Sequence, residues 1–572
     1  MRYKWHKFRM YLLPALCFAL NLLTALFWVA LRVNYSGISK FLGADTNPTF
    51  LIMNLPLMVA VAAWVSCALS LWGISGWGRR KWPSVLSLFL GLIFAVAAVV
   101  VVLFGAKDYL RFILPHFWKS LAVSGCIIVF ALVLYFPITG KRFLKSLVVA
   151  AVILGCVVLG YQLRPCTFTY GAVVYAVEDD YQIIFSTSDS AIAWVEIGGE
   201  CYYDLYAGSM KSADRVHKIE VPQSVLDSAK GYSIHAKQMI YRGPFGGYTG
   251  PEISQSYTFR PVDTSDGLDY FSLSDVHEAV DAAIQATQAP NSGPYDFIVL
   301  LGDLVSMVET EKDAQLANEL AHGITGGAIP VIYARGNHEI KGEYAEVLYK
   351  YVGAKGEDYY YTVTLGEEVF AVVLDMGEDH EDDWWEYYGT ARFDVYRQEQ
   401  TEMLEEILED GEYENYRYRL ALCHIPVVYV DKHGYFEEFR NEWTQLLNEM
   451  GIDMCLSGHK HVLWPFIPGQ VEPGEKLVFS RGYSGMERKT DDGYLTDFHF
   501  PGFLVGRRSL VQEGGTSDGH DEYIGLVTSV RFAEGIQISW YVNSDHETPT
   551  CYYPFAEETF STIVSELKHS EK

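Results

Sequence analysis

The sequence carries five short polar clusters in this order: Ser274-Asp275-Val276-His277, Gly302-Asp303, Gly336-Asn337-His338-Glu339, His424-Ile425-Pro426 and Gly458-His459-Lys460-His461. Each cluster follows a short apolar run rich in Val, Ile, Leu or Tyr, and helix-like segments separate the runs. Such runs, bounded by turn residues, are typical of buried parallel strands. Polar residues just past the carboxyl ends of several strands are where an α/β sheet builds its site. The stretch therefore predicts an α/β domain with one composite site.

The residue types in these clusters suit a pair of metal ions. Asp, Asn and His supply oxygen and imidazole nitrogen, which suit Mn, Zn or Fe. A carboxylate can bridge two cations, and two cations roughly 3.5–4 Å apart can clamp a phosphoryl group during in-line displacement. The clusters therefore predict a dinuclear site that acts on a phosphoester.

The order D-x-H, G-D, G-N-H-E, H, G-H-x-H resembles that of the calcineurin-like metallophosphoesterase superfamily. The resemblance implies a core of two stacked mixed β-sheets flanked by helices. It also implies that Asp303 bridges two Mn, Fe or Zn ions and that His338, which is not a ligand, acts on the leaving group. The ligand sets implied are Asp275, His277, Asp303 and His461 for the first ion, and Asp303, Asn337, His424 and His459 for the second.

The resemblance implies hydrolysis of a phosphomonoester or phosphodiester by a metal-activated hydroxide. Departures from related patterns narrow this expectation. Protein serine/threonine phosphatases of the superfamily carry G-D-x-V-D-R-G, whereas Ser306 and Met307 replace the second Asp and the Arg here. Phosphoprotein specificity is therefore not expected, and the orienting partner of His338 stays open. Purple acid phosphatases place a metal-ligating Tyr at the position of Ser306, so ferric–tyrosinate chemistry is not expected.

The first 163 residues have a different character from the rest of the chain. They hold 15 Lys and Arg against 2 Asp and Glu, and five apolar runs of about membrane-spanning length. Buried core helices are the alternative, but five such runs with almost no acidic residues favour a bilayer. We expect a transmembrane region over 1–163, with spans at Met10–Leu31, Phe50–Trp72, Val85–Phe104, Ser120–Phe136 and Ser146–Leu163.

Charge sets the expected orientation. Ten basic residues flank one side of the predicted spans and five the other, which favours a cytoplasmic N-terminus. Five spans then place everything after Leu163 outside the cytoplasm, in a multi-pass protein of the cell membrane. That remainder has 29 basic and 69 acidic residues, a net charge of −40, which argues against nucleic-acid binding.

Residues 164–262 contain short β-rich runs punctuated by Gly, Asp and Ser. This pattern predicts a β-sandwich. A β-sandwich directly before such a core resembles the fibronectin-like N-terminal domain of purple acid phosphatases. Residues 263–572 would then form the phosphoesterase domain, with strands after His461 completing its second sheet. Cys166 and Cys201 could form a disulfide, although an odd cysteine count defines no framework.

Three arginines are candidates for substrate contacts. Arg335 either touches phosphate or forms a structural salt bridge. Arg507 and Arg508 follow a long aromatic connection that contains Phe498, Phe500 and Phe503. This connection either packs on its own domain or reaches the membrane interface or the substrate, with one arginine meeting phosphate. The second case would suit a lipid-linked or envelope-bound phosphoester.

The sequence thus predicts a membrane-anchored, extracytoplasmic, dimetal phosphoesterase. The alternative is a non-catalytic membrane receptor or sensor whose metal domain binds a phosphorylated ligand. Loss of ligands would favour the alternative, and none of the expected ligands is missing. Catalysis is therefore the leading hypothesis.

Overall fold

The computed structural model describes residues 166–554, apart from 244–245, 289–293, 431–436, 462–463, 467, 469–475, 481–488, 496, 512–516, 533 and 543–549, together with a few isolated positions before residue 100. The five predicted spans therefore lie almost wholly outside the described residues. Among the residues that are described, no helix is both long and apolar enough to cross a membrane. The chain divides into two compact units, and the folded region discussed below belongs to the unit made of Gly160–Asp382 and Thr390–Lys572.

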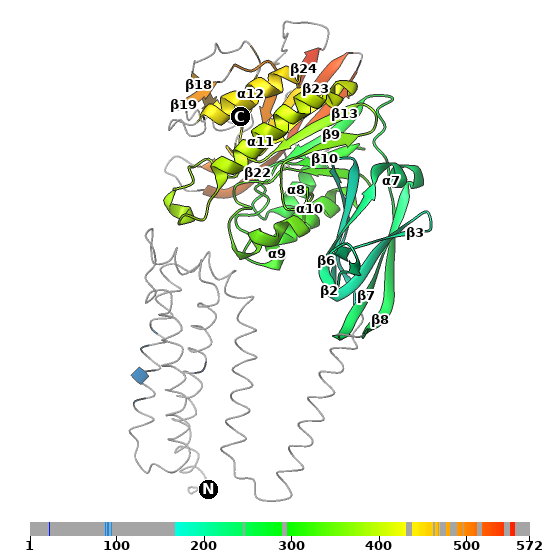
Figure 1. The fold of residues 1–572 in the computed structure, drawn as a ribbon. Helices are drawn as coiled ribbons and strands as arrows, with labels where there is room; N and C mark the ends of the chain where they lie inside the picture. Colours follow the sequence, from blue (N-terminus) through cyan, green and yellow to red (C-terminus); the bar gives the residue numbers. More distant parts are fainter. Residues whose placement is uncertain are drawn as a thin grey trace, which may run out of the picture. The chain divides into compact units, whose positions relative to one another are not determined.

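The larger sheet is built around three short parallel strands, β9 (Leu268–Leu273), β10 (Phe297–Leu300) and β11 (Pro330–Tyr333), of which Figure 1 labels β9 and β10. All three coincide with predicted strands. Antiparallel strands extend the sheet beyond β9, in the order β22, β23 and β24. These strands are β22 (Ser517–Arg531), with β21 (Arg507–Val511) paired to it, β23 (Gly535–Val542) and β24 (Thr550–Pro554). The expectation that the strands after His461 complete the second sheet was therefore wrong for β22 and β23, and it was also wrong for Lys476–Phe479, which lies in a small separate sheet.

The β-rich region before the core extends the same sheet on its other side. Its strands were predicted, but β1 pairs in parallel with β11, so the region shares a sheet with the core instead of forming a self-contained sandwich. The long strand β2 pairs with β1 and β6 along its first half and with β7 and β3 along its second half. The elements are β1 (Phe168–Val177), β2 (Asp180–Ile197), β3 (Glu200–Tyr203), β4 (Leu205–Tyr206), β5 (Met210–Lys211), β6 (Asp214–Pro222), α7 (Gln223–Ala229), β7 (Gly231–Gly243) and β8 (Gly246–Thr258).

A second sheet of six strands has the order β12-β13-β14-β16-β20-β17. Its central strands β13, β14 and β16 are parallel, and every residue of β13 is buried. Burial on both faces explains why β13 reads as an unbroken apolar run. The strands are β12 (Tyr361–Leu365), β13 (Val369–Leu374), β14 (Tyr418–Cys423), β16 (Met454–Ser457), β17 (Trp464–Phe466) and β20 (Gly502–Leu504), and a small separate sheet holds β15 (Tyr429–Val430), β18 (Lys476–Ser480) and β19 (Lys489–Leu495).

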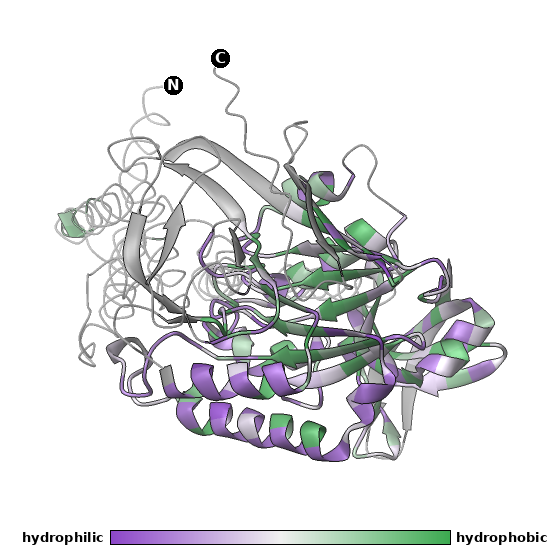
Figure 2. Ribbon diagram, turned by 90° about the horizontal axis from the view of Figure 1, so that it is seen from above, coloured by the Kyte–Doolittle hydropathy of each residue, from purple (hydrophilic) through white to green (hydrophobic). Residues whose placement is uncertain are grey.

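The two sheets stack through one hydrophobic core. Phe297 and Ile332 of the larger sheet belong to the same buried cluster as Leu420 and Leu456 of the second. Helices α8 and α10 bury their apolar residues against the outer face of the larger sheet, and α11 and α12 against that of the second. Figure 2 shows hydrophobic strands at the centre and helices with mixed hydropathy outside them. Stacked mixed sheets flanked by helices were the predicted core.

The helices agree with the predicted segments, one of which is a 3₁₀-helix. Tyr344–Tyr351, one of the helix-like segments expected between the polar clusters, corresponds to a 3₁₀-helix at Glu343–Lys350. The helices are α8 (Val280–Thr287), α9 (Glu311–Ala314), α10 (Leu316–Thr325), η1 (Glu343–Lys350), α11 (Phe393–Asp410), η3 (Glu412–Asn415) and α12 (Glu437–Glu449), while η2 (Trp385–Tyr387) lies in the other unit.

The structure also bears on two further expectations. Cys166 and Cys201 are free thiols, so the disulfide considered for them is not formed. Phe498 and Phe500 are buried in the cluster beneath α11 and α12, and Phe503 is buried between the sheets. The aromatic side chains of this connection therefore pack on their own domain and are not available to a membrane surface.

Candidate metal centre

The predicted ligands converge where strands of both sheets end. Asp275 and His277 follow β9, Asp303 follows β10, and Asn337 follows β11 of the larger sheet. From the second sheet, His424 follows β14, and His459 and His461 follow β16. Parallel strands of one sheet present their carboxyl ends at the same edge, and the edges of the two sheets meet here, so Asp275 and His461, 186 positions apart, come into contact. The site exists only because the two sheets are stacked with these strand ends facing each other.

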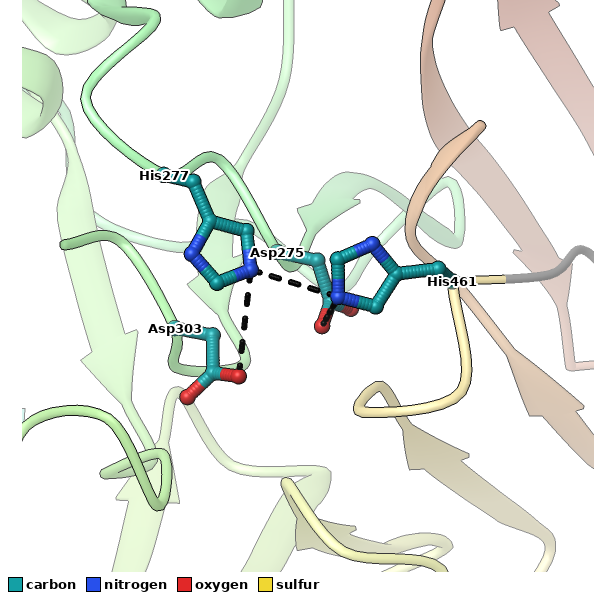
Figure 3. A group of neighbouring side chains, drawn as sticks. All are labelled: Asp275, His277, Asp303 and His461. Atoms are coloured by element: carbon teal, nitrogen blue, oxygen red, sulfur yellow. Dashed lines mark hydrogen bonds and ion pairs between the residues drawn. The ribbon is translucent and has the colours of Figure 1, made fainter. Parts of the chain in front are cut away.

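One group consists of Asp275, His277, Asp303 and His461 (Figure 3). The Nε2 atoms of His277 and His461 lie 3.2 Å apart, and His461 Nε2 lies 3.3 Å from Asp275 Oδ1. His277 Nε2 is 4.0 Å from Asp303 Oδ2. Candidate ligand atoms of the four residues all lie within 4.8 Å of one another. This is the set expected for the first ion.

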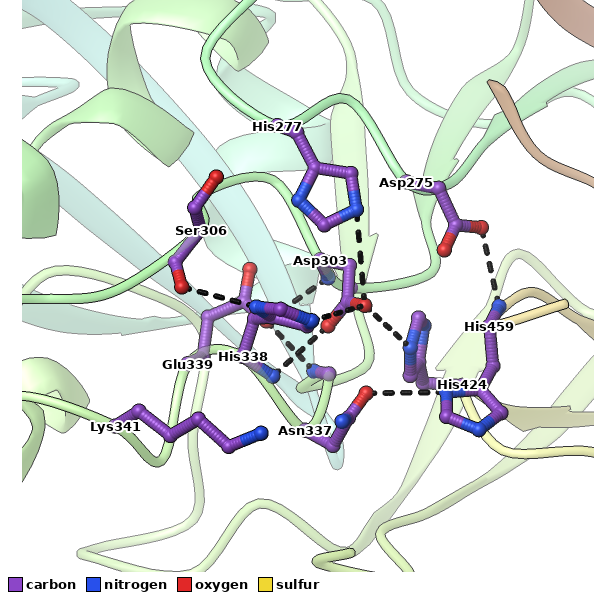
Figure 4. Close-up of polar contacts among 12 residues, drawn as sticks. Asp275, His277, Asp303, Ser306, Asn337, His338, Glu339, Lys341, His424 and His459 are labelled. Carbon is purple, nitrogen blue, oxygen red and sulfur yellow. Dashed lines mark hydrogen bonds and ion pairs between the residues drawn. The ribbon is translucent and has the colours of Figure 1, made fainter. Parts of the chain in front are cut away.

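The other group consists of Asp303, His424 and His459. His424 Nε2 lies 3.1 Å from the same Asp303 Oδ2 atom that faces His277. His459 Nδ1 lies 3.1 Å from Asn337 Oδ1, which brings the fourth expected ligand to this group (Figure 4). Asp303 is thus common to both groups, as a bridging carboxylate must be.

The electrostatics of the site call for positive charge. Burial lowers the pKa of His424, but the Asp303 carboxylate outweighs burial and raises that pKa to about 10. Asp275 Oδ1 is buried and makes no hydrogen bond. An acceptor in this state is costly unless a cation satisfies it. The chemistry of the donor set and this atom together fit a metal site.

The orientation of His424 also fits ligation. Its Nδ1–H donates to the carbonyl oxygen of Leu301 at 2.5 Å, which directs Nε2 at Asp303. A hydrogen bond from one ring nitrogen to a backbone carbonyl is the usual way to select the tautomer of a ligating histidine. Burial, followed by the charge of Lys460, lowers the pKa of His459 and so favours the neutral imidazole that a metal needs.

Backbone strain is concentrated at the site. Among the described non-glycine residues with positive φ are five predicted ligands, which have values between 43° and 71°. Such conformations cost of order 1–3 kcal/mol each and persist where the surroundings enforce them. A Cβ on Gly336 would lie 2.2 Å from Asp303 Oδ1, so only glycine permits this approach. The strained ligands are Asp275, His277, Asp303, His459 and His461.

His338 lies at the rim of the site, with its Nε2 atom 3.9 Å from Asp303 Oδ2. Its Nδ1–H donates to the main-chain carbonyl of Ser306 at 2.9 Å. Ser306 is held in turn by Glu278, whose carboxylate accepts its N–H at 2.8 Å and its Oγ–H at 2.9 Å. The residue that replaces the expected orienting Asp therefore supplies the partner of His338, through its backbone.

Three carboxylates that sequence reasoning did not assign surround the ligands, and two of them, Glu339 and Glu378, are buried. Glu339 accepts the N–H groups of Asp303, Leu304 and Gly336, and so ties the loops after β10 and β11 together. Its place in the Gly336-Asn337-His338-Glu339 cluster was a signal for it. Glu378 and Asp379, after β13, contact Asn337 and His459, and no motif pointed to them.

The arginine candidates differ in outcome. Arg335 forms a salt bridge with the buried Asp375, Nε to Oδ2 at 2.7 Å, and packs over the Tyr359 ring at 4.0 Å. Of its two predicted roles, the structural salt bridge is the one present. The side chains of Arg507 and Arg508 lie outside the described residues. Gly506, just before them, abuts Asp275, since a Cβ there would lie 2.7 Å from Oδ2. Their role stays a prediction.

Comparison with known proteins agrees with this geometry. Residues 271–463 match the family model of the calcineurin-like phosphoesterases. No curated protein matches the sequence. The chain is similar to a purple acid phosphatase from yellow lupin (Lupinus luteus) seeds, with 12% identity over 67% of this chain and 73% of that one, at a TM-score of 0.43.

Two more solved structures show the same low level of similarity. PhoD has 10% identity over 68% of this chain and 92% of its own, at a TM-score of 0.39. A dimetal phosphatase from Danio rerio has 12% identity over 51% and 98%, at a TM-score of 0.33. The assignment rests on the family model, whose match contains every predicted ligand. Residues 271–463 form a calcineurin-like metallophosphoesterase domain.

Proposed function

We propose that this protein is a membrane-anchored, extracytoplasmic phosphoester hydrolase with a dinuclear metal site. The observation that carries the proposal is the shared carboxylate, because Asp303 Oδ2 faces His277 of one group and His424 of the other. Asp275, His277, Asp303 and His461 would hold the first ion, and Asp303, Asn337, His424 and His459 the second. Their donors suit Mn, Fe or Zn.

The ions would supply an activated nucleophile and neutralise charge on the phosphoryl oxygens. The protein's part is to hold the ligands and to move a proton. Because a carbonyl oxygen can only accept, the bond to Ser306 keeps the proton of His338 on Nδ1. Nε2, which lies toward the metal ligands, is then the nitrogen that can give a proton to the substrate. His338 is therefore proposed to protonate or stabilise the leaving oxygen.

The location is proposed from charge and hydropathy. Residues 1–163 contain five apolar runs, and more basic residues lie on the side of the predicted membrane that holds the N-terminus than on the other side. This distribution supports a cytoplasmic N-terminus and an external catalytic domain. The substrate would then be met at the membrane surface, as a lipid-linked or envelope-bound phosphoester. Arg507 or Arg508, which follow the site-lining Gly506, are proposed to contact its phosphate.

The proposal is tested by separating metal binding from chemistry. The purified protein would be assayed with phosphomonoester, phosphodiester and pyrophosphate substrates in the presence of Mn, Fe or Zn. Asp303→Asn should lose both ions and activity. His338→Ala should keep the ions and lower kcat by roughly 10²–10⁴-fold. If the wild-type protein binds two ions but cleaves none of these substrates, the result would favour the receptor alternative. No feature of the described site favours that alternative.

A further inference from the structure

We propose that Glu378 and Asp379, adjacent residues in the loop after β13, are positioning residues that orient Asn337 and His459 toward the second metal ion. The inference rests on the dinuclear part of the proposed function. Neither residue is a predicted ligand. Each contacts a predicted ligand that lies on another loop, Glu378 contacting Asn337 and Asp379 contacting His459. Both of these ligands are assigned to the second ion.

Asp379 selects the coordinating nitrogen of His459. Its Oδ2 lies 3.0 Å from His459 Nε2, so that nitrogen carries the proton and donates it to the carboxylate. Nδ1 is left with its lone pair, 3.1 Å from Asn337 Oδ1, on the side where the other ligands converge.

Glu378 does the same for Asn337. Asn337 donates Nδ2–H to Glu378 Oε1 at 2.9 Å. This bond distinguishes the two ends of the amide, so that Oδ1 is the atom turned toward His459. Without it, the amide could rotate by half a turn and present an N–H to the cation. A carboxylate that holds the donor end therefore keeps the oxygen available as a ligand.

Two lysines offset the charge of this pair. Lys341 Nζ lies 2.9 Å from Glu378 Oε2, and Lys460 Nζ lies 3.5 Å from Asp379 Oδ2. The carboxylates are mostly buried, with 3% and 16% of their side chains exposed, so their positions are restricted. Since each negative charge already has a lysine, the main contribution of the pair to metal binding is orientation of ligands rather than added attraction.

The test measures metal binding by the full chain in detergent, without reference to activity. Equilibrium dialysis against Mn²⁺, with the bound metal counted, gives the affinities of the two ions. Asp379→Asn and Glu378→Gln should each weaken the second ion about 10–100-fold and leave the first within about twofold, the size usual for partners of metal ligands. Glu399→Gln, a similar change of charge at a surface pair with Arg392, should change neither affinity.

A double-variant comparison separates orientation from simple charge. In a His459→Ala background, Asp379→Asn should cause no further loss, because no imidazole remains to be oriented. A loss of equal size in both backgrounds would overturn the proposal, as would Asp379→Asn binding both ions like the wild type. The melting temperature of the metal-free protein should differ little between Asp379→Asn and wild type. Metal binding by the wild type is measured first. If the wild type does not bind two ions, the proposed function itself is contradicted.

Discussion

Replacing Arg335 by Met tests whether this residue serves the fold or the substrate. The guanidinium pairs with Asp375, whose side chain is 1% exposed, and only 15% of the Arg335 side chain is exposed. After the change, the carboxylate keeps two partners, the N–H of Gly377 at 2.8 Å and the hydroxyl of Tyr396 at 3.2 Å. Neither is charged, so Asp375 becomes a buried carboxylate without a counter-ion.

The expected cost follows from that state. Breaking a buried ion pair by removing one partner destabilises a protein by about 3–5 kcal/mol. Loss of the cation over the Tyr359 ring, 4.0 Å from its centre, belongs to the same change. The two remaining hydrogen bonds to Asp375 favour the lower half of this range. A penalty of about 3 kcal/mol should lower the melting temperature by roughly 5–10 °C.

The assay is thermal unfolding of the full chain in detergent with a chelator present, followed by tryptophan fluorescence. Chelation removes any contribution of bound metal to the difference. Asp375→Asn and the double variant complete a cycle. The double variant should be more stable than Arg335→Met alone, because Asn leaves no uncompensated charge.

Substrate kinetics test the alternative role of Arg335, in which its side chain contacts phosphate. An arginine that contacts phosphate would leave the melting temperature of Arg335→Met within about 1 °C of wild type and raise KM strongly. That outcome would refute the structural role derived from the Asp375 contact.

Three further predictions concern metal, pH and topology. Metal analysis should find about two transition ions per chain, chelation should abolish phosphoester hydrolysis and Mn²⁺ should restore it; activity that survives chelation contradicts the dinuclear site. Burial raises the pKa of Asp453 from 3.8 to about 6 in the folded protein, so its stabilising contribution is present below pH 4 and is lost as the pH rises through 6. Asp453→Asn should therefore gain more melting temperature over metal-free wild type at pH 8 than at pH 5, and an equal difference at both pH values would exclude this effect. A protease added outside intact cells or spheroplasts should reach a tag placed after Lys572, whereas a protected tag would reverse the proposed orientation.

Local pattern was sufficient for the parallel strands and for the ligands. β10 is an apolar run buried at every residue, β14 is buried except at Arg419, and the polar residues Asp303 and His424 follow within three residues of their ends. The order of the motifs, through its resemblance to the calcineurin-like pattern, predicted that Asp303 and His424 would meet, although β10 and β14 belong to different sheets. The helix-like segment expected at 344–351 is present as a 3₁₀-helix at 343–350, a form that apolar spacing of three and four residues does not distinguish from an α-helix.

Tertiary structure alone decided the features that depend on distant backbone or on single contacts. β22 belongs to the larger sheet because its residues pair with β9, some 250 positions earlier. The alternating pattern of a strand does not indicate which strand it pairs with. The partner of His338 is a backbone carbonyl, which every residue possesses and no motif can signal. Glu378 and Asp379 lie in an acidic stretch of a chain that has 71 Asp and Glu. The stacking of the two sheets brings the loop after β13 against the loop after β11, and the parallel order β13-β14-β16 within one sheet brings it near the loop after β16. These contacts distinguish the two residues from solvated carboxylates.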